Sequence, residues 1–185
     1  MTLERKRFLS SEELDRAARE IVDLARGQQI AAAGGYAMQM YGSDRLTIDL
    51  DVLALDPIPT LPELGPLIFD GACGGYQTCA PSGPPVDVII RTGDFAALYE
   101  EALRTAWEHP GAPIRVVCPA YLVAMKMEAG RPKDDLDLMF LLTQASDEER
   151  QGIRRIVRRF LGPYGTKDLA TRLAEADWLE HRRRL

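Results

Sequence analysis

The chain has 185 residues, of which 46% are hydrophobic and 28% charged, so it is long and apolar enough to bury a core. Its formal net charge of −5 argues against a protein whose whole surface binds nucleic acid. No stretch approaches the roughly 18 apolar residues of a membrane helix and no signal-peptide segment opens the chain, so we expect no membrane partner and a cytoplasmic location.

The first forty residues predict a helix, a buried strand and a second short helix. Ser10 and Glu13 have the spacing of a capping box, and apolar residues then recur at helical spacing until Gly27. The apolar run 30–33 predicts a strand that ends in a glycine pair, with a short helix over 36–41.

The segment 48–55 carries the most informative pattern in the chain. Asp49 and Asp51 stand two residues apart in an otherwise apolar strand, and the period of two along a strand places both carboxylates on one face. Such a pair predicts a site with oxygen ligands. The alternative is a strand with one solvent-exposed face, where aspartate only keeps the strand soluble.

The rest of the chain predicts loops, one more informative strand and then mainly helices. The segment 57–85 is rich in Pro and Gly and is expected to be loop, with one short helix or strand at most. A strand over 86–91 has Asp87 near its start. The elements expected after it are a brief strand at 114–117 and helices over 95–107, 119–129, 134–143, 147–160 and 167–182.

No internal repeat or long linker interrupts this pattern. We therefore expect an α/β (α+β) fold in which residues 1–117 form a small mixed β-sheet core flanked by helices. Residues 118–185 are expected to form a helical part that packs on this core as one structural unit.

Closely spaced carboxylates repel each other when ionised unless a cation lies between them, and oxygen ligands favour Mg²⁺ or Mn²⁺ over zinc. Asp87 would complete a set of three with Asp49 and Asp51, able to hold two ions about 3.5–4 Å apart for displacement at phosphorus. The pair Gly34 and Gly35 strengthens this hypothesis, because backbone N–H groups at a helix start can face a phosphate. An ordinary tight turn is the alternative.

Two segments resemble a known family. The stretch AGGYAMQMYGSDRLTIDLDVLAL is similar to the hG[GS] to DhD signature of nucleotidyltransferases of the DNA polymerase β type. It more narrowly resembles the AbiEii/AbiGii-toxin-like branch through Gly42, Arg45, Thr47, Asp49 and Asp51. The later stretch YLVAMKMEAGRPKDDLDLMFLL resembles a second segment of that branch through Lys126, Arg131, Lys133, Asp134 and Asp137.

The resemblance implies a nucleotidyltransferase fold and a role for each matching residue. Metal ligation and catalysis would fall to Asp49, Asp51 and Asp87, the last helping to deprotonate an acceptor hydroxyl. Lys126 would join the catalytic set by neutralising triphosphate charge, with a surface lysine on an amphipathic helix as the alternative. The residues expected to contact the nucleotide are Gly34, Gly35, Arg45, Thr47 and Lys126.

Some charged residues keep two interpretations. Arg45 and Arg131 could pair with the nucleotide or with the acids at 134, 135 and 137. Helix capping and dipole complementarity would explain those acids without catalysis. Five arginines within the expected helix 147–160 could receive RNA, although a solvated helix face is favoured.

The function expected from these patterns is transfer of a nucleoside monophosphate from an NTP, with Mg²⁺ or Mn²⁺, to an RNA such as tRNA, a protein or a small molecule. The branch resemblance adds the expectation of a toxin in a toxin–antitoxin or phage-defence pair, with a cognate antitoxin protein as partner. The alternative from another class is a catalytically inactive nucleotidyltransferase fold that serves as a binding or regulatory module. A resistance-type enzyme acting on small molecules would share the chemistry.

Overall fold

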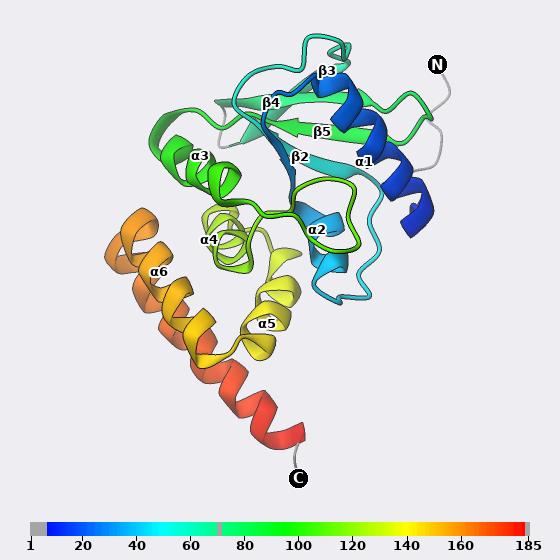
Figure 1. Cartoon of the computed structure of the whole chain (residues 1–185). Helices are drawn as coiled ribbons and strands as arrows, with labels where there is room; N and C mark the ends of the chain where they lie inside the picture. The colour runs from blue at the N-terminus through cyan, green and yellow to red at the C-terminus, as the bar shows by residue number, and fades with distance from the viewer. Residues whose placement is uncertain (1–6, 70–71, 184–185) are drawn as a thin grey trace. The chain divides into compact units, whose positions relative to one another are not determined.

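A computed structural model describes residues 7–69 and 72–183. The chain divides into two compact units, Met1–Val117 and Cys118–Leu185. Figure 1 shows that the strands belong to the first unit and that the second is helical. A functional division at residue 117 stays a prediction, because compactness does not show what each unit does.

The first unit is built on one five-stranded mixed sheet with the strand order β1-β2-β5-β4-β3 (Figure 1). Its strands are β1 (Ile30–Ala32), β2 (Leu50–Ala54), β3 (Gly65–Phe69), β4 (Ala72–Cys79) and β5 (Pro85–Ile89). β2 and β5 pair in parallel, whereas the other three pairings are antiparallel. The expected α/β class with a small mixed sheet is therefore confirmed.

The helices of this unit are α1 (Ser11–Ala25), α2 (Gly34–Met40), a 3-10 turn η1 (Gly93–Phe95) and α3 (Ala96–Thr105). α1 begins at the predicted capping box, because Ser10 Oγ accepts from the Glu13 N–H at 3.2 Å and the Glu13 carboxylate accepts from the Ser10 N–H at 2.9 Å. The apolar side of α1 packs on one face of the sheet, in a core that includes Leu14, Ala17, Ala18, Ile21, Leu50, Val52, Val86 and Val88.

The expectation for 57–85 is wrong. This segment forms the hairpin β3–β4 instead of a loop with one short element, and β4 pairs with β5 along five residues. Pro and Gly lower strand propensity, but pairing of β4 with β5 on one side and β3 on the other overrides that local preference. The hairpin places Gln77 opposite Asp87.

Three boundaries also differ from the predictions. The glycine pair forms the first turn of α2 instead of a separate turn, and β2 begins at Leu50, so Asp49 lies just before it. The strand expected at 114–117 reduces to isolated bridges of Val116 with Ala32 and Trp107. Asp49 therefore belongs to the segment before β2 and not to the strand itself.

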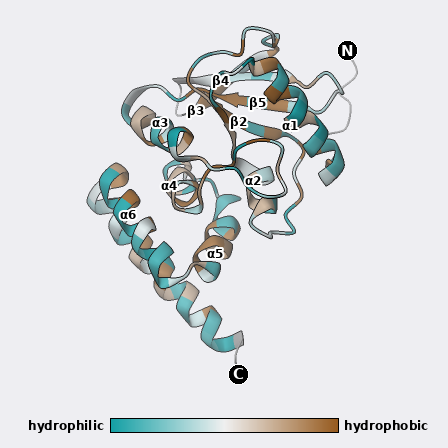
Figure 2. Cartoon of the chain, viewed as in Figure 1, coloured by the Kyte–Doolittle hydropathy of each residue, from teal (hydrophilic) through white to brown (hydrophobic). Residues whose placement is uncertain are grey.

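The second unit contains α4 (Pro119–Ala129), α5 (Asp134–Gln144) and α6 (Asp147–Arg183). The predicted helix over 119–129 is confirmed. The two helices expected after residue 146 both lie within α6, which is broken at Gly162, with φ 63°, just before Pro163. Figure 2 shows hydrophilic residues along most of α6. None of the helices within 7–69 and 72–183 is both long enough and apolar enough to cross a membrane.

Candidate active site

The parallel pairing of β2 with β5 brings two of the predicted carboxylates together. Asp51 and Asp87 are direct Cα partners in this ladder. Asp49 lies two residues before Asp51, at the residue that precedes β2. All three side chains are partly exposed, and Asp49 and Asp87 line the same cavity of about 470 Å³.

Two polar neighbours hold these carboxylates. Thr47, buried to 5% exposure, donates its Oγ1 hydroxyl to Asp49 Oδ1 at 3.0 Å. Gln77 on β4 donates its Nε2 amide to Asp87 Oδ1 at 3.2 Å. Each of these hydrogen bonds fixes the orientation of the carboxylate that accepts it. Thr47, expected at the nucleotide, thus contacts Asp49 directly.

The glycine pair is explained by close packing against the same region. Gly34 has φ +52°, and a Cβ at this position would lie 1.7 Å from Asp51 Oδ2. A Cβ at Gly35 would lie 2.6 Å from the Cβ of Thr47. The missing side chains therefore make room for Asp51 and Thr47 at the start of α2. The predicted contact of both glycines with nucleotide phosphates stays a prediction.

The carboxylate oxygens of this region are suitable ligands for a hard divalent cation, but their side chains are not arranged around one common point. Oxygen ligands from Asp49, Asp51 and Asp87 suit Mg²⁺ or Mn²⁺. Across 7–69 and 72–183, however, no group of three or more His, Cys, Asp or Glu side chains is arranged to hold a metal ion. The register sets Asp51 opposite Asp87, and a metal site at the three carboxylates stays a prediction.

Lys126 has a different environment from the one expected. It lies on α4 with 5% exposure, and its Nζ contacts Asp134 Oδ1 at 3.1 Å and Asp137 Oδ2 at 2.5 Å. Arg131 Nε also contacts Asp134, at 2.6 Å. Burial would raise the pKa of Asp134, but the Arg131 hydrogen bond and the nearby Lys126 charge outweigh burial and lower it.

These contacts show that Lys126 is a buried residue and not a surface lysine, and its role at the triphosphate stays a prediction. Its ammonium already lies between two buried carboxylates, which compensate its charge. Arg131 pairs with Asp134 of α5, one of the two kinds of partner that the sequence left open. Asp135 is exposed and pairs with Arg172 at 2.9 Å.

Arg45 lies in the first unit, before β2. Its backbone carbonyl accepts a hydrogen bond from Gln39 Nε2, and its backbone N–H donates to Ser43 Oγ. Its role at the nucleotide stays a prediction.

Sequence reasoning missed Gln77, which hydrogen-bonds to Asp87. It lies on β4, which was expected to be loop. Exposure alternates along this strand, since Tyr76 and Thr78 are buried and Gln77 and Cys79 are exposed. The residue types do not show this alternation, because Gln77 and Thr78 are both polar, so no sequence signal pointed to Gln77.

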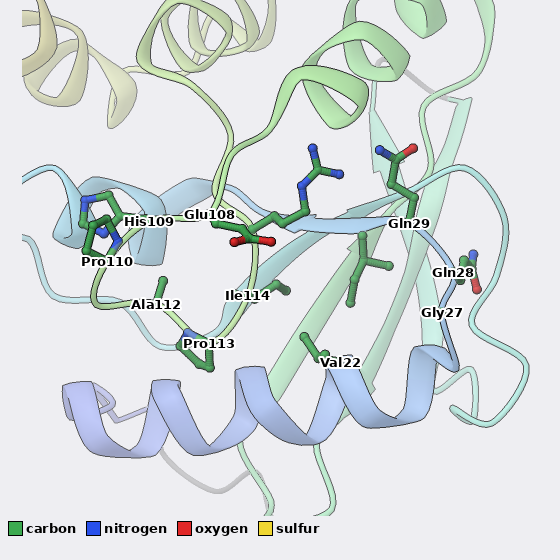
Figure 3. A pocket seen from close by; sticks show the side chains of 12 residues that line it. Val22, Gly27, Gln28, Gln29, Glu108, His109, Pro110, Ala112, Pro113 and Ile114 are labelled. Atoms are coloured by element: carbon green, nitrogen blue, oxygen red, sulfur yellow. The ribbon is translucent and has the colours of Figure 1, made fainter.

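A second cavity, of about 770 Å³, offers different chemistry. Figure 3 shows Val22 of α1 and the segment from Glu108 to Ile114 around it. Ile30 of β1 lines this cavity and pairs with Ala54, so the cavity lies at the opposite end of β2 from Asp49. Glu108 is its one carboxylate residue among those described, so this cavity does not supply paired acidic ligands. The His109 ring packs edge-on against Trp107, with centroids 5.4 Å apart.

Comparisons with known proteins give structural likenesses only. The chain matches no protein-family model, and no curated protein is similar to it in sequence. An antigenic nucleotidyltransferase-like protein from Paracoccidioides brasiliensis shows 16% identity and a TM-score of 0.46, with 91% of this chain and 95% of that chain covered. The antibiotic-resistance factor ANT(2'')-Ia shows 16% identity and a TM-score of 0.47, with 95% and 99% covered. Likenesses at this level do not assign an activity.

The packing of Gly34 on Asp51 can be tested by a double-mutant cycle. We predict that Gly34→Ala lowers the free energy of unfolding by about 1–3 kcal/mol more than Gly42→Ala, because overpacking is added to backbone strain. Gly42 is a matched control with φ +88°, where an added Cβ would meet nothing within 4 Å. In an Asp51→Gly background, which also removes the Cβ 2.9 Å away, most of the excess should vanish. An excess of the same size in both backgrounds, measured by urea denaturation, would contradict the described contact.

The buried position of Lys126 predicts a structural cost for its removal. Lys126→Met should lower the free energy of unfolding by about 3–5 kcal/mol, because Asp134 and Asp137 would remain buried without their shared cation. Lys133→Met, at an exposed lysine, is the control and should change it by about 0.5 kcal/mol or less. Equal small losses in urea denaturation would mean that Lys126 is not part of a buried ion network.

Proposed function

We propose that this chain is an NTP-dependent nucleotidyltransferase with its reaction centre at Asp49, Asp51 and Asp87. The observation that carries the proposal is the ladder register that sets Asp51 opposite Asp87 on parallel neighbouring strands, with Asp49 two residues earlier. Paired acidic residues at one end of a sheet, beside a glycine pair that starts a helix, suit metal-assisted phosphoryl chemistry.

The reaction would join an acceptor hydroxyl to the α-phosphorus of the NTP and release pyrophosphate. Asp49, Asp51 and Asp87 would hold Mg²⁺ or Mn²⁺, which when bound supplies positive charge at the phosphate oxygens. Asp87 would accept the proton of the acceptor hydroxyl. Thr47 would keep Asp49 oriented, and Gln77 would keep Asp87 oriented, through the hydrogen bonds already described.

The toxin role and the individual nucleotide ligands are separate from the proposed reaction. A toxin role with a cognate antitoxin rests on the resemblance of two sequence segments to the AbiEii/AbiGii-toxin-like branch. It stays a prediction, as do Arg45 and Lys126 as nucleotide ligands.

Loss of the central carboxylates should abolish transfer. Protein incubated with α-³²P-labelled NTPs, Mg²⁺ and mixed acceptors, including pooled tRNA, cell lysate and small hydroxyl compounds, should form labelled product with release of pyrophosphate. Asp51→Asn and Asp87→Asn should each lower the rate at least about 100-fold. Asp56→Asn is the control, since this exposed residue lies beyond the opposite end of β2. Labelling by Asp51→Asn at the wild-type rate would refute the assignment.

The alternative, an inactive fold that serves as a binding or regulatory module, predicts a different response to nucleotide. A ligand that binds the native state at 100 times its Kd adds about 2.7 kcal/mol of stability. We predict that Mg²⁺ with ATP or GTP raises the melting temperature of the wild type and not that of Asp51→Asn. An unchanged melting temperature for the wild type with every NTP would instead favour a module that does not use nucleotide.

A further inference from the structure

The first half of α6 has four exposed arginines on one side of the helix. They are called the arginine face below, and they are Arg154, Arg155, Arg158 and Arg159. At 3.6 residues per turn they fall within an arc of about 140°. The buried residues Ile153 and Val157 lie on the side away from this arc, where α6 packs against α4 and α5. The arginine face is therefore the side of the helix that the second unit leaves open.

The fold does not compensate the charge of this face as it does elsewhere on α6. Arg150 belongs to the same run of arginines, but its side chain is only 12% exposed and its Nη1 contacts Asp177 Oδ1 at 2.5 Å. By contrast, Arg154, Arg155 and Arg158 make no ion pair with any residue of 7–69 and 72–183. Three guanidinium groups are thus left for an external anion.

The spacing of the arginines adds repulsion between like charges. Arg158 follows Arg154 by four residues and Arg155 by three, and such neighbours on a helix destabilise it when they carry the same charge. No Asp or Glu stands three or four residues from any member of the arginine face. A bound polyanion would offset this repulsion. Arg154 and Arg158 are about 6 Å apart along the axis, so consecutive phosphates of one strand can contact both.

An exposed aromatic ring lies at the turn that follows the arginine face. The chain turns back at Gly162, and the two halves of α6 run side by side in opposite directions (Figure 1), joined by the contact of Arg150 with Asp177. Tyr164, two residues after the turn, is 90% exposed. A ring with this exposure contributes little to the core. Aromatic rings beside basic residues are typical of sites where unpaired bases stack.

These features favour a nucleic acid over a membrane or an acidic protein. A helix that lies on a membrane needs a free apolar side, whereas Ile153 and Val157 are buried. Protein interfaces have an apolar core, which the arginine face lacks. The formal net negative charge of the chain arises in the first unit, since the second has more Lys and Arg than Asp and Glu. The second unit is therefore the one that attracts a polyanion.

We propose that the arginine face and Tyr164 bind a single-stranded nucleic acid. The guanidinium groups contact consecutive phosphates, and one unpaired base stacks on the Tyr164 ring. This mode of binding depends on the backbone charge and on a base that is not in a duplex, and it does not require a particular sequence. The site lies within the second unit and does not rest on the transferase activity proposed for Asp49, Asp51 and Asp87.

The test measures binding to the full chain without NTP or metal ion, so that its outcome is independent of the transferase assignment. Fluorescence anisotropy would compare a labelled strand of about 12 nucleotides as single-stranded RNA, as single-stranded DNA and as a duplex. We expect at least one single strand to bind about 5-fold or more tightly than the duplex, and the tighter of the two identifies the natural ligand as RNA or DNA. Vesicles of anionic phospholipid should not displace it.

Arg154→Gln/Arg158→Gln tests the phosphate contacts. The variant should weaken binding at least about 10-fold and make the slope of log K against log salt concentration less steep by about 1.4, because each contact to a single strand contributes about 0.7. Its melting temperature should not fall, since a repulsive pair is removed. Arg16→Gln/Arg19→Gln is the matched control: it removes the same charge from two exposed arginines of α1 and should change neither quantity.

Tyr164→Ala tests the stacked base separately. It should weaken binding at least about 5-fold at an unchanged salt slope, whereas Tyr164→Phe should bind like the wild type, because it keeps the ring. The proposal is overturned if neither single strand binds at low salt, if the duplex binds as tightly, or if vesicles displace the strand. Equal losses in the two double-arginine variants would also overturn it, because they would show an effect of net charge alone.

Discussion

In the centre of the sheet, β2 lies parallel to β5, and every element of the candidate site takes its place from this pairing. The residues between the two strands form the hairpin β3–β4, which returns antiparallel to β5 and sets Gln77 beside Asp87. On the other side, β1 pairs with β2 and leads into α2, whose glycines lie against Asp51 and Thr47. A shift of one residue between β2 and β5 would turn Asp51 away from Asp87, because successive side chains of a strand point to opposite faces.

The carboxylates of Asp49, Asp51 and Asp87 repel one another when they are ionised. Polar groups next to each of them reduce this repulsion. Asp49 receives a hydrogen bond from Thr47, Asp87 receives one from Gln77, and Asp51 lies against the start of α2, where the helix dipole favours negative charge. In the second unit, repulsion between Asp134 and Asp137 is offset by the ammonium group of Lys126, which forms a salt bridge with each. The first set of acids is thus accessible to a cation, whereas the second is internally compensated.

The sequence predicted those features that depend on local pattern. The capping box at Ser10, the strand with Asp51 and the helix beginning at Pro119 follow from spacing and propensity alone. The hairpin β3–β4 could not be predicted in this way, because its Gly and Pro residues disfavour strands and only pairing with β5 stabilises it. Lys126 illustrates a different limit: its spacing from the acids of α5 is visible in the sequence, but its burial between them is a tertiary property. For the same reason, the contact of Gln77 with Asp87 could be found only once the register of β4 with β5 was known.

The central claim is that Asp49, Asp51 and Asp87 together form a divalent-metal site, and Mn²⁺ tests it most directly. In a two-dimensional ¹H–¹⁵N NMR spectrum, substoichiometric Mn²⁺ should first broaden the amide signals around residues 49–51 and 87, and Mg²⁺ should reverse the effect. Asp51→Asn should abolish this selective broadening without changing the rest of the spectrum. Broadening that begins elsewhere on the chain, or that is the same in Asp51→Asn, would contradict the account.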